Sequence, residues 1–243
     1  MSTLTGKNAV VTGGSRGIGL AIARALVERG ASVMITGTRQ KALTDASLEL
    51  ASAARGGSVV AQLADVRQYE DVERMLNEAA SRFGGIDVLV NNAGVGVFAR
   101  VADMSIAQWH EIIDTNLTGV FYCCHAVLPH LRRRGGGWII NISSLSGTNP
   151  FVDGAAYCAS KAGLNAFSEA LMQEVRHDGI RVACVMPGSV NTGFSGQQPG
   201  GEDWKLAPED VAQVVADLLA HPSRSLPSRV EIRPARPPKR PAS

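Results

Sequence analysis

The sequence predicts a doubly wound α/β fold, in which a parallel seven-stranded sheet is covered by helices on both faces. Short runs of β-branched and other apolar residues alternate along the chain with longer amphipathic stretches, the order in which helices connect parallel strands. The strand-like runs are mostly apolar throughout and do not alternate with polar residues. This pattern is typical of strands buried on both faces.

Seven strands and six helices are expected, in alternation along the chain. The strands are predicted at residues 8–12, 32–36, 58–63, 87–92, 137–143, 181–187 and 229–233. The helices are predicted at residues 17–29, 39–54, 68–82, 105–133, 155–177 and 208–220. The last helix opens with a proline and two acids, which suit a helix N-terminus. No shift in composition or internal repeat marks a second domain, so residues 1–233 are expected to form one domain.

Two stretches interrupt the alternation. Residues 191–207 are rich in glycine and polar residues but include Phe194 and Trp204. A loop of this length within a compact domain is uncommon and often binds a ligand, so we expect a substrate loop here. Residues 234–243 are basic and proline-rich, and we expect them to form a solvated, extended tail.

Composition excludes several classes of function. Among the 243 residues, 45% are hydrophobic and the net charge is only +2, so neither a largely disordered chain nor a nucleic-acid partner is expected. The chain shows no secretion signal and no apolar run of the roughly 18 residues that a membrane span needs. Its four cysteines form no CxxC pair and its histidines lack ligand-like spacing, so a cytoplasmic protein without a metal site is expected.

A glycine-rich turn follows the first strand. Residues 12–19 read TGGSRGIG and lead directly into the first predicted helix. Glycines allow a tight turn and close approach of the backbone to a ligand, while the helix N-terminus presents free N–H groups to an anion. The spacing differs from the G-x-G-x-x-G pattern of many dinucleotide sites, but the position predicts binding of a pyrophosphate.

The second strand indicates which nucleotide is bound. Dinucleotide folds specific for NAD usually place an acid about 20 residues beyond the glycines, where it binds the ribose 2′-hydroxyl. Here the second strand ends at Thr38 and Arg39, and no acid occurs between Glu28 and Asp45. Arg39 and Arg16 could instead bind a 2′-phosphate, although each could also be an ordinary surface residue. The sequence therefore favours NADP(H) over NAD(H).

Tyr157 and Lys161 lie one helical turn apart in the predicted helix over residues 155–177. A nearby ammonium group favours the phenolate and so lowers the pKa of a tyrosine. Lowering that pKa from about 10 to about 7 requires roughly 4 kcal/mol. One charge at about 4 Å supplies roughly 1 kcal/mol in water and about 4 kcal/mol at an effective dielectric near 20. The pair therefore needs a partly enclosed site.

A serine at the end of a predicted strand completes this candidate site. Ser144 follows the apolar strand over residues 137–143, and ligands bind beyond the strand ends of open parallel sheets. A serine hydroxyl there can donate to an oxygen on which negative charge develops. Its neighbour Ser143 is an equal alternative on these grounds.

Taken together, these motifs resemble those of the short-chain dehydrogenases/reductases, in their compact single-domain branch. The matching pieces occur in family order between residues 5 and 220: TGGSRGIG, Asp65-Val66, NNAG (91–94), Asn116, ISS (142–144), Tyr157-x-x-x-Lys161 and Pro187-Gly188. The resemblance implies a Rossmann-type sheet and an NAD(P)-dependent enzyme that interconverts a carbonyl and an alcohol. Tyr157 would act as acid/base, Lys161 would bind ribose and tune it, Ser144 rather than Ser143 would hold the substrate oxygen, and Asn116 would organise a proton relay.

The resemblance also implies a set of binding residues. Those for the cofactor would be Gly13, Ser15, Arg16, Gly17, Ile18, Gly19, Thr38, Arg39, Asp65, Val66, Asn92, Ala93, Gly94, Tyr157, Lys161, Pro187, Gly188, Val190 and Thr192. Those for the substrate would be Ser144, Leu145, Phe151, Tyr157 and Phe194, with Val95, Phe98 and Trp204 as further walls. Asp65 has a competing interpretation as the cap of the helix that starts near Tyr69.

The mostly apolar walls favour a small to medium ketone, aldehyde or oxoacyl substrate. A 3-oxoacyl-carrier-protein reductase is the nearest alternative, and its acidic carrier could dock on Arg132–Arg134 or on the basic tail. A non-catalytic NADP-binding sensor or scaffold is an alternative of another class, but none of the four catalytic residues is missing. The C-terminal region is too short for a typical sugar-nucleotide epimerase. By resemblance we expect a homodimer or homotetramer.

Overall fold

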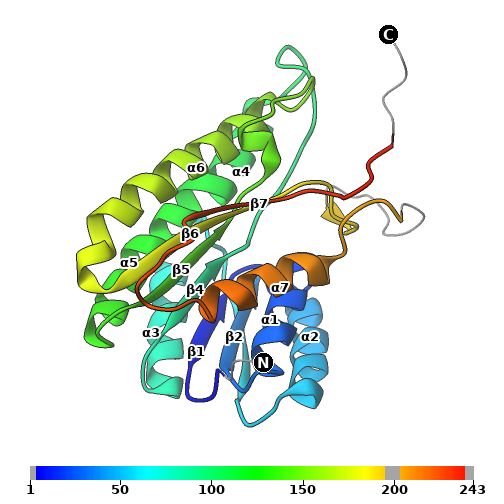
Figure 1. Cartoon of the computed structure of the whole chain (residues 1–243). Helices are drawn as coiled ribbons and strands as arrows, with labels where there is room; N and C mark the ends of the chain where they lie inside the picture. The colour runs from blue at the N-terminus through cyan, green and yellow to red at the C-terminus, as the bar shows by residue number, and fades with distance from the viewer. Residues whose placement is uncertain (1–3, 195–202, 239–243) are drawn as a thin grey trace.

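The computed structural model describes residues 4–194 and 203–238 of the chain (Figure 1). Seven parallel strands form one sheet in the order β3-β2-β1-β4-β5-β6-β7. They are β1 (Asn8–Val11), β2 (Ser32–Gly37), β3 (Val59–Leu63), β4 (Val88–Asn91), β5 (Gly137–Ile142), β6 (Ile180–Pro187) and β7 (Arg229–Ile232). Each strand end lies within one residue of its predicted position, and the predicted fold class is confirmed.

Helices cover both faces of this sheet (Figure 1). One face carries α1 (Gly17–Val27), α2 (Gln40–Ala53) and α7 (Pro208–Leu219), whose apolar residues share one buried cluster with the strands. The other face carries α3 (Tyr69–Phe83), α5 (Gly119–Arg133) and α6 (Ala155–Val175), which form a second cluster. Among the described helices, none is long and apolar enough to cross a membrane.

The strand order places a crevice at the carboxyl edge of the sheet. β1 pairs with β2 on one side and with β4 on the other. The strands β2 and β3 therefore extend the sheet to one side of β1, and β4 to β7 extend it to the other side. Loops that follow β1 and β4 consequently diverge at their carboxyl ends and leave room for a ligand.

The predicted helix over residues 105–133 is wrong as a single α-helix. The structure has α4 (Ile106–Ile113), a π-helical turn over Asp114–Thr118, and then α5. Thr115 and Asn116 within this turn are buried. A π-turn adds a residue to a helix without changing its apolar character, so hydrophobic periodicity does not reveal it.

Candidate active site

A cleft of about 1410 Å³ lies at the carboxyl edge of the sheet. With two exceptions, every residue that the sequence predicted for the catalytic, cofactor and substrate sites lines it. The exceptions are Gly19 and Asn116, which lie directly behind the lining. The cleft extends from the end of β2 to the segments that follow β5, β6 and β7, so it is long enough to bring a dinucleotide and a substrate together.

The glycine-rich turn after β1 is packed so tightly that larger residues would not fit. Gly13 has a left-handed φ of 62°, and a Cβ there would lie 2.9 Å from the Cα of Ala93. A Cβ on Gly19 would collide with the Asn92 side chain and the Gly13 carbonyl. The Asn92 amide in turn donates to the carbonyls of Thr12 and Gly13, at 3.0 and 3.1 Å. These contacts hold the turn against the loop after β4.

The N-terminus of α1 faces this turn without a capping side chain. Arg16 is the N-cap residue and makes no side-chain cap, and the first turn of α1 contains no acid. At the end of β2, the buried hydroxyl of Thr36 also has no hydrogen-bond partner among the described residues. Free N–H groups at the positive end of a helix dipole suit a pyrophosphate, so the residues present fit a dinucleotide.

Two arginines that the sequence predicted for the 2′-phosphate have different surroundings. Arg39 is exposed at the start of α2, and its guanidinium makes no hydrogen bond or ion pair in the described part of the chain. Arg16 donates to the carbonyl of Gly193, at 3.3 Å, and so connects the glycine-rich turn to the loop after β6. Of these two arginines, only Arg39 therefore has a guanidinium without a hydrogen bond, and it lies just after β2.

Asp65 does not cap α3, which excludes its competing interpretation. The N-cap of α3 is Gln68, without a side-chain cap. The Asp65 carboxylate instead accepts hydrogen bonds from Arg67, whose Nη2 lies 2.6 Å away. This ion pair lowers the pKa of Asp65 below its ordinary value. Arg67 also lines the cleft and was missed, although its place two residues after Asp65 could have suggested it.

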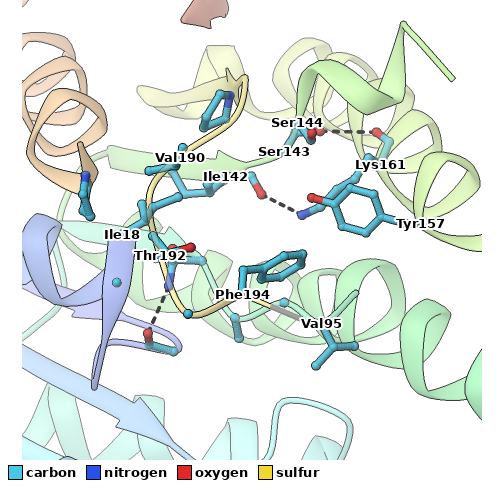
Figure 2. A pocket seen from close by; sticks show the side chains of 18 of the residues that line it. Ile18, Val95, Ile142, Ser143, Ser144, Tyr157, Lys161, Val190, Thr192 and Phe194 are labelled. Carbon is cyan, nitrogen blue, oxygen red and sulfur yellow. Dashed lines mark hydrogen bonds between the residues drawn. The ribbon is translucent and has the colours of Figure 1, made fainter. Parts of the chain in front are cut away.

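Lys161 is only 5% exposed, and its ammonium lies at the end of β5. Its Nζ donates to the carbonyl of Ile142 at 3.0 Å and lies 5.8 Å from the centre of the Tyr157 ring. Figure 2 shows the two side chains next to each other, with Ser144 and Phe194 to either side. Burial lowers the pKa of Lys161 from its ordinary value of 10.5 to about 8.

Tyr157 does not have the lowered pKa that the sequence analysis expected from its lysine. Burial raises the pKa of this phenol above its ordinary value, and a hydrogen bond with Ser144 opposes the shift in part. The burial cost of a phenolate therefore outweighs the hydrogen bond that favours it. The structure thus gives a tyrosine that holds its proton at neutral pH.

The two adjacent serines are clearly distinguished. Ser143 donates to the Oδ1 of Asn165 at 2.6 Å and to the carbonyl of Lys161 at 3.3 Å, so its hydroxyl is engaged beneath α6. Ser144 caps a short 3₁₀ turn over Leu145–Gly147 and donates to Ser146 at 3.1 Å, and its hydroxyl also acts on Tyr157, where it lowers the pKa of the phenol in part. Ser144 is therefore the serine that stands beside the phenol.

Asn116 is completely buried and does not line the cleft, but its hydrogen bonds reach residues that do. Its side chain accepts from the N–H of Val95 at 2.8 Å and donates to the Val95 carbonyl at 2.9 Å. It also donates to Ser160 at 3.1 Å, and Ser160 donates to the carbonyl of Tyr157 at 2.8 Å. The π-turn thereby links the loop after β4 to the first turns of α6.

Three phenylalanines form an apolar cluster around Tyr157. The rings of Phe98 and Phe194 lie 5.6 and 5.7 Å from the tyrosine ring, centre to centre. Phe151 lies 5.6 Å from Phe98. All three phenylalanines and Tyr157 line the cleft.

The structure describes parts of both the predicted substrate loop and the predicted tail. A bridge between Val190 and Leu206 closes the base of the loop, and Phe194 and Trp204 line the cleft as predicted, while residues 195–202 lie outside the described part. The described part of the tail after Pro234 is exposed, in agreement with the prediction of a solvated tail, and Pro234, Pro237 and Pro238 also line the cleft. Residues 239–243 of the tail are also outside the described part.

Sequence and structure comparisons assign the family. A family model described as short chain dehydrogenase matches residues 7–202. The chain belongs to the short-chain dehydrogenase family. This short-chain dehydrogenase is 36% identical over 234 residues to an uncharacterised oxidoreductase of Staphylococcus epidermidis, covering 96% of this chain and 100% of the relative.

Solved structures agree with this assignment. An alcohol dehydrogenase from the archaeon Thermococcus sibiricus, complexed with 5-hydroxy-NADP, is 33% identical with a TM-score of 0.89, covering 96% of this chain and 99% of that one. A metagenomic short-chain oxidoreductase in complex with NADP is 38% identical with a TM-score of 0.84, covering 97% and 100%. The predicted family and enzyme class are confirmed, and this short-chain dehydrogenase is an oxidoreductase that binds a nicotinamide dinucleotide.

The buried Lys161 ammonium generates a testable stability effect. Its pKa is about 8 in the folded chain and 10.5 ordinarily, so the unfolded chain binds more protons between these values and stability rises with pH across that window. Below pH 8 the burial cost is fully present, at about 3 kcal/mol from about 1.4 kcal/mol per unit. In urea unfolding without cofactor, Lys161→Met should therefore be more stable than the wild type by about this amount at pH 7.

The gain should shrink as the pH rises from 8 and reach zero above about 10.5, where the wild-type lysine is neutral in both states. Lys41→Met is the matched control, because Lys41 is exposed on α2 and pairs only with Asp45. A Lys161→Met variant that is less stable than the wild type at pH 7 would contradict the claim that burying the Lys161 ammonium destabilises the folded chain.

Proposed function

We propose that this enzyme uses NADP(H) to interconvert a carbonyl and an alcohol, with Tyr157 as the acid/base. The observation that carries the proposal is the position of Tyr157, which lies beside Ser144 in the cleft and whose ring centre is 5.8 Å from the buried Lys161 ammonium. In the reducing direction, one proton and one hydride are added to a carbonyl, and the alcohol is released.

Each residue has a defined task in this scheme. Ser144 donates a hydrogen bond to the carbonyl oxygen and so stabilises the negative charge that develops on it. Tyr157 donates its proton to that oxygen, and its raised pKa keeps the proton available at neutral pH. The positive charge of Lys161 then stabilises the phenolate that remains. When bound, the nicotinamide ring supplies or accepts the hydride.

Asn116 and Ser160 position this group without contacting the substrate. Their hydrogen bonds connect Val95, on the cleft wall, to the backbone of Tyr157. Small displacements of a reacting group are costly in rate, and this network restricts the phenol to one location.

The residues around Arg39, where the 2′-phosphate of the cofactor would bind, support NADP(H) over NAD(H). Arg39 offers a guanidinium without a side-chain partner among the described residues, and the two acids that line the cleft are Asp65 and Glu111. The Asp65 carboxylate is already engaged by Arg67. Two similar structures were solved with NADP or its 5-hydroxy form, which agrees with this preference.

The walls near Tyr157 support an apolar carbonyl substrate. Phe98, Phe151 and Phe194 surround the phenol and present no charge. The Arg132–Arg134 run gives no support to docking of an acidic carrier protein. Arg132 pairs with Asp178 and Arg134 pairs with Asp87, at the amino edge of the sheet and away from the cleft.

A screen of NADPH consumption tests the reaction and the cofactor together. The panel holds aryl ketones, aldehydes and oxoacyl thioesters, with NADH in parallel. We expect turnover of apolar carbonyls with NADPH and a lower Kd for NADPH than for NADH. Arg39→Gln should raise the Kd for NADPH at least ten-fold while changing that for NADH less than two-fold. Equal affinities for the two cofactors in the wild type would contradict the NADP(H) preference.

The adjacent serines offer a matched pair of variants. Ser144→Ala should lower kcat/KM for reduction by about 10²–10³-fold, the range seen when one donor to a developing oxyanion is removed. Ser143→Ala should retain more than a tenth of the activity but lower the free energy of unfolding, because Asn165 loses the hydroxyl donor to its Oδ1 and keeps only the weaker thiol donor of Cys184 there. Steady-state kinetics and urea unfolding measure the two effects. If Ser143→Ala lost the activity and Ser144→Ala retained it, Ser144 would have no part in the mechanism.

A further inference from the structure

Four residues of the segment Arg233–Pro238, which follows β7, line the cleft. We propose that this segment forms a wall of the substrate site and limits the size of the carbonyl compound that the enzyme accepts. The inference rests on the proposed carbonyl reduction and deepens it, because it names both the residues that restrict the substrate and the class of substrate that they admit.

The end of β7 fixes where this segment starts. The N–H of Gly188, which follows β6, donates to the carbonyl of Ile232 at 2.8 Å. A Cβ on Gly188 would lie 2.9 Å from the Cδ of Pro234 and 3.2 Å from Leu145. Pro234 therefore packs where β6 and β7 end, close to Leu145. Because Leu145 is the residue after Ser144, this contact places the wall next to the proposed site of the carbonyl oxygen.

The segment turns its prolines towards the cleft. Pro234, Pro237 and Pro238 line the cleft, whereas Ala235 and Arg236, which lie between them, do not. Proline has no backbone N–H and a fixed φ, so it presents an apolar surface without an unsatisfied donor and loses little conformational freedom when a ligand packs on it. In Figure 1 the segment continues from β7 along the edge of the sheet towards the loop that joins β6 to α7.

Charge does not dominate this wall. Arg233 also lines the cleft, but its Nη2 lies 2.6 Å from the Glu231 carboxylate, and this exposed pair neutralises it. The substrate site is thus bounded by phenylalanines around Tyr157 and by prolines next to Leu145. Two rigid apolar walls suit a compact, flat carbonyl compound such as an aryl alkyl ketone, and they disfavour bulkier ring systems.

Two truncations test the wall. A stop codon in place of Pro234 removes the prolines, whereas a stop codon in place of Lys239 retains them and serves as the matched control. The measurement is the ratio of kcat/KM for 2-acetylnaphthalene to that for acetophenone, together with the Kd for NADPH. We expect the first truncation to raise this ratio at least ten-fold, while the second changes it less than two-fold and neither changes the Kd more than three-fold.

Thiol labelling provides a second test that does not depend on truncation. Pro237→Cys and its neighbour Ala235→Cys are both exposed positions, and all four native cysteines are buried. NADP⁺ and acetophenone are both oxidised and cannot react with each other, so together they occupy the site without turnover. This mixture should slow modification of the Pro237→Cys thiol by an aromatic disulfide reagent at least five-fold and that of the Ala235→Cys thiol less than two-fold.

The possible failures can be told apart. If the wild type reduces no carbonyl in the panel, the proposed function is wrong. If the wild type reduces ketones but the Pro234 truncation leaves the substrate ratio unchanged, or the ternary mixture protects both thiols equally, the wall is wrong and the reductase proposal stands.

Discussion

A buried ammonium group at the carboxyl edge of the sheet is the constraint on which the rest of the site depends. Lys161 is enclosed where β5 ends, and its direct hydrogen bond is to the backbone carbonyl of Ile142. Removing a charge from water is costly unless hydrogen bonds or other charges compensate. The surrounding residues hold the group in place, because Ser143 ties the Lys161 carbonyl and Asn165 together beneath α6. The first turns of α6 are thus fixed to the sheet.

The same burial sets the protonation of both groups proposed for catalysis. It lowers the pKa of Lys161 from 10.5 to about 8 and raises the pKa of Tyr157 above its ordinary value of 10.0, so the two values move apart. At neutral pH the lysine is still mostly charged and the tyrosine is protonated, which is the state that proton donation to a carbonyl requires. An anion formed on Tyr157 would find the lysine charge close by, and the π-turn at Asn116 keeps the phenol in that position through Ser160.

The sequence predicted the features that depend on local pattern. Strands buried on both faces are read directly from continuous apolar runs, and Tyr157 and Lys161 share a helix face because of their spacing. The π-turn was missed because a one-residue insertion leaves the helical periodicity nearly intact. Ser143 and Ser144 could be separated on physical grounds only by Asn165, which lies 22 residues from Ser143 in sequence and contacts it through the fold. The position of the prolines at the cleft was not predicted for a similar reason, since the packing of Pro234 against Gly188 joins the segment after β7 to the loop after β6.

The most direct measurement compares Tyr157→Phe with the wild type, using a ketone that the wild type reduces with NADPH. The substitution removes the hydroxyl and leaves the ring, so its packing against Phe98 and Phe194 is retained. If Tyr157 donates the proton, kcat should fall at least 10²-fold while the Kd for NADPH stays within about three-fold of the wild type, consistent with the usual contribution of general acid catalysis. A Tyr157→Phe enzyme that binds NADPH normally and retains most of its kcat would contradict the proposed chemistry.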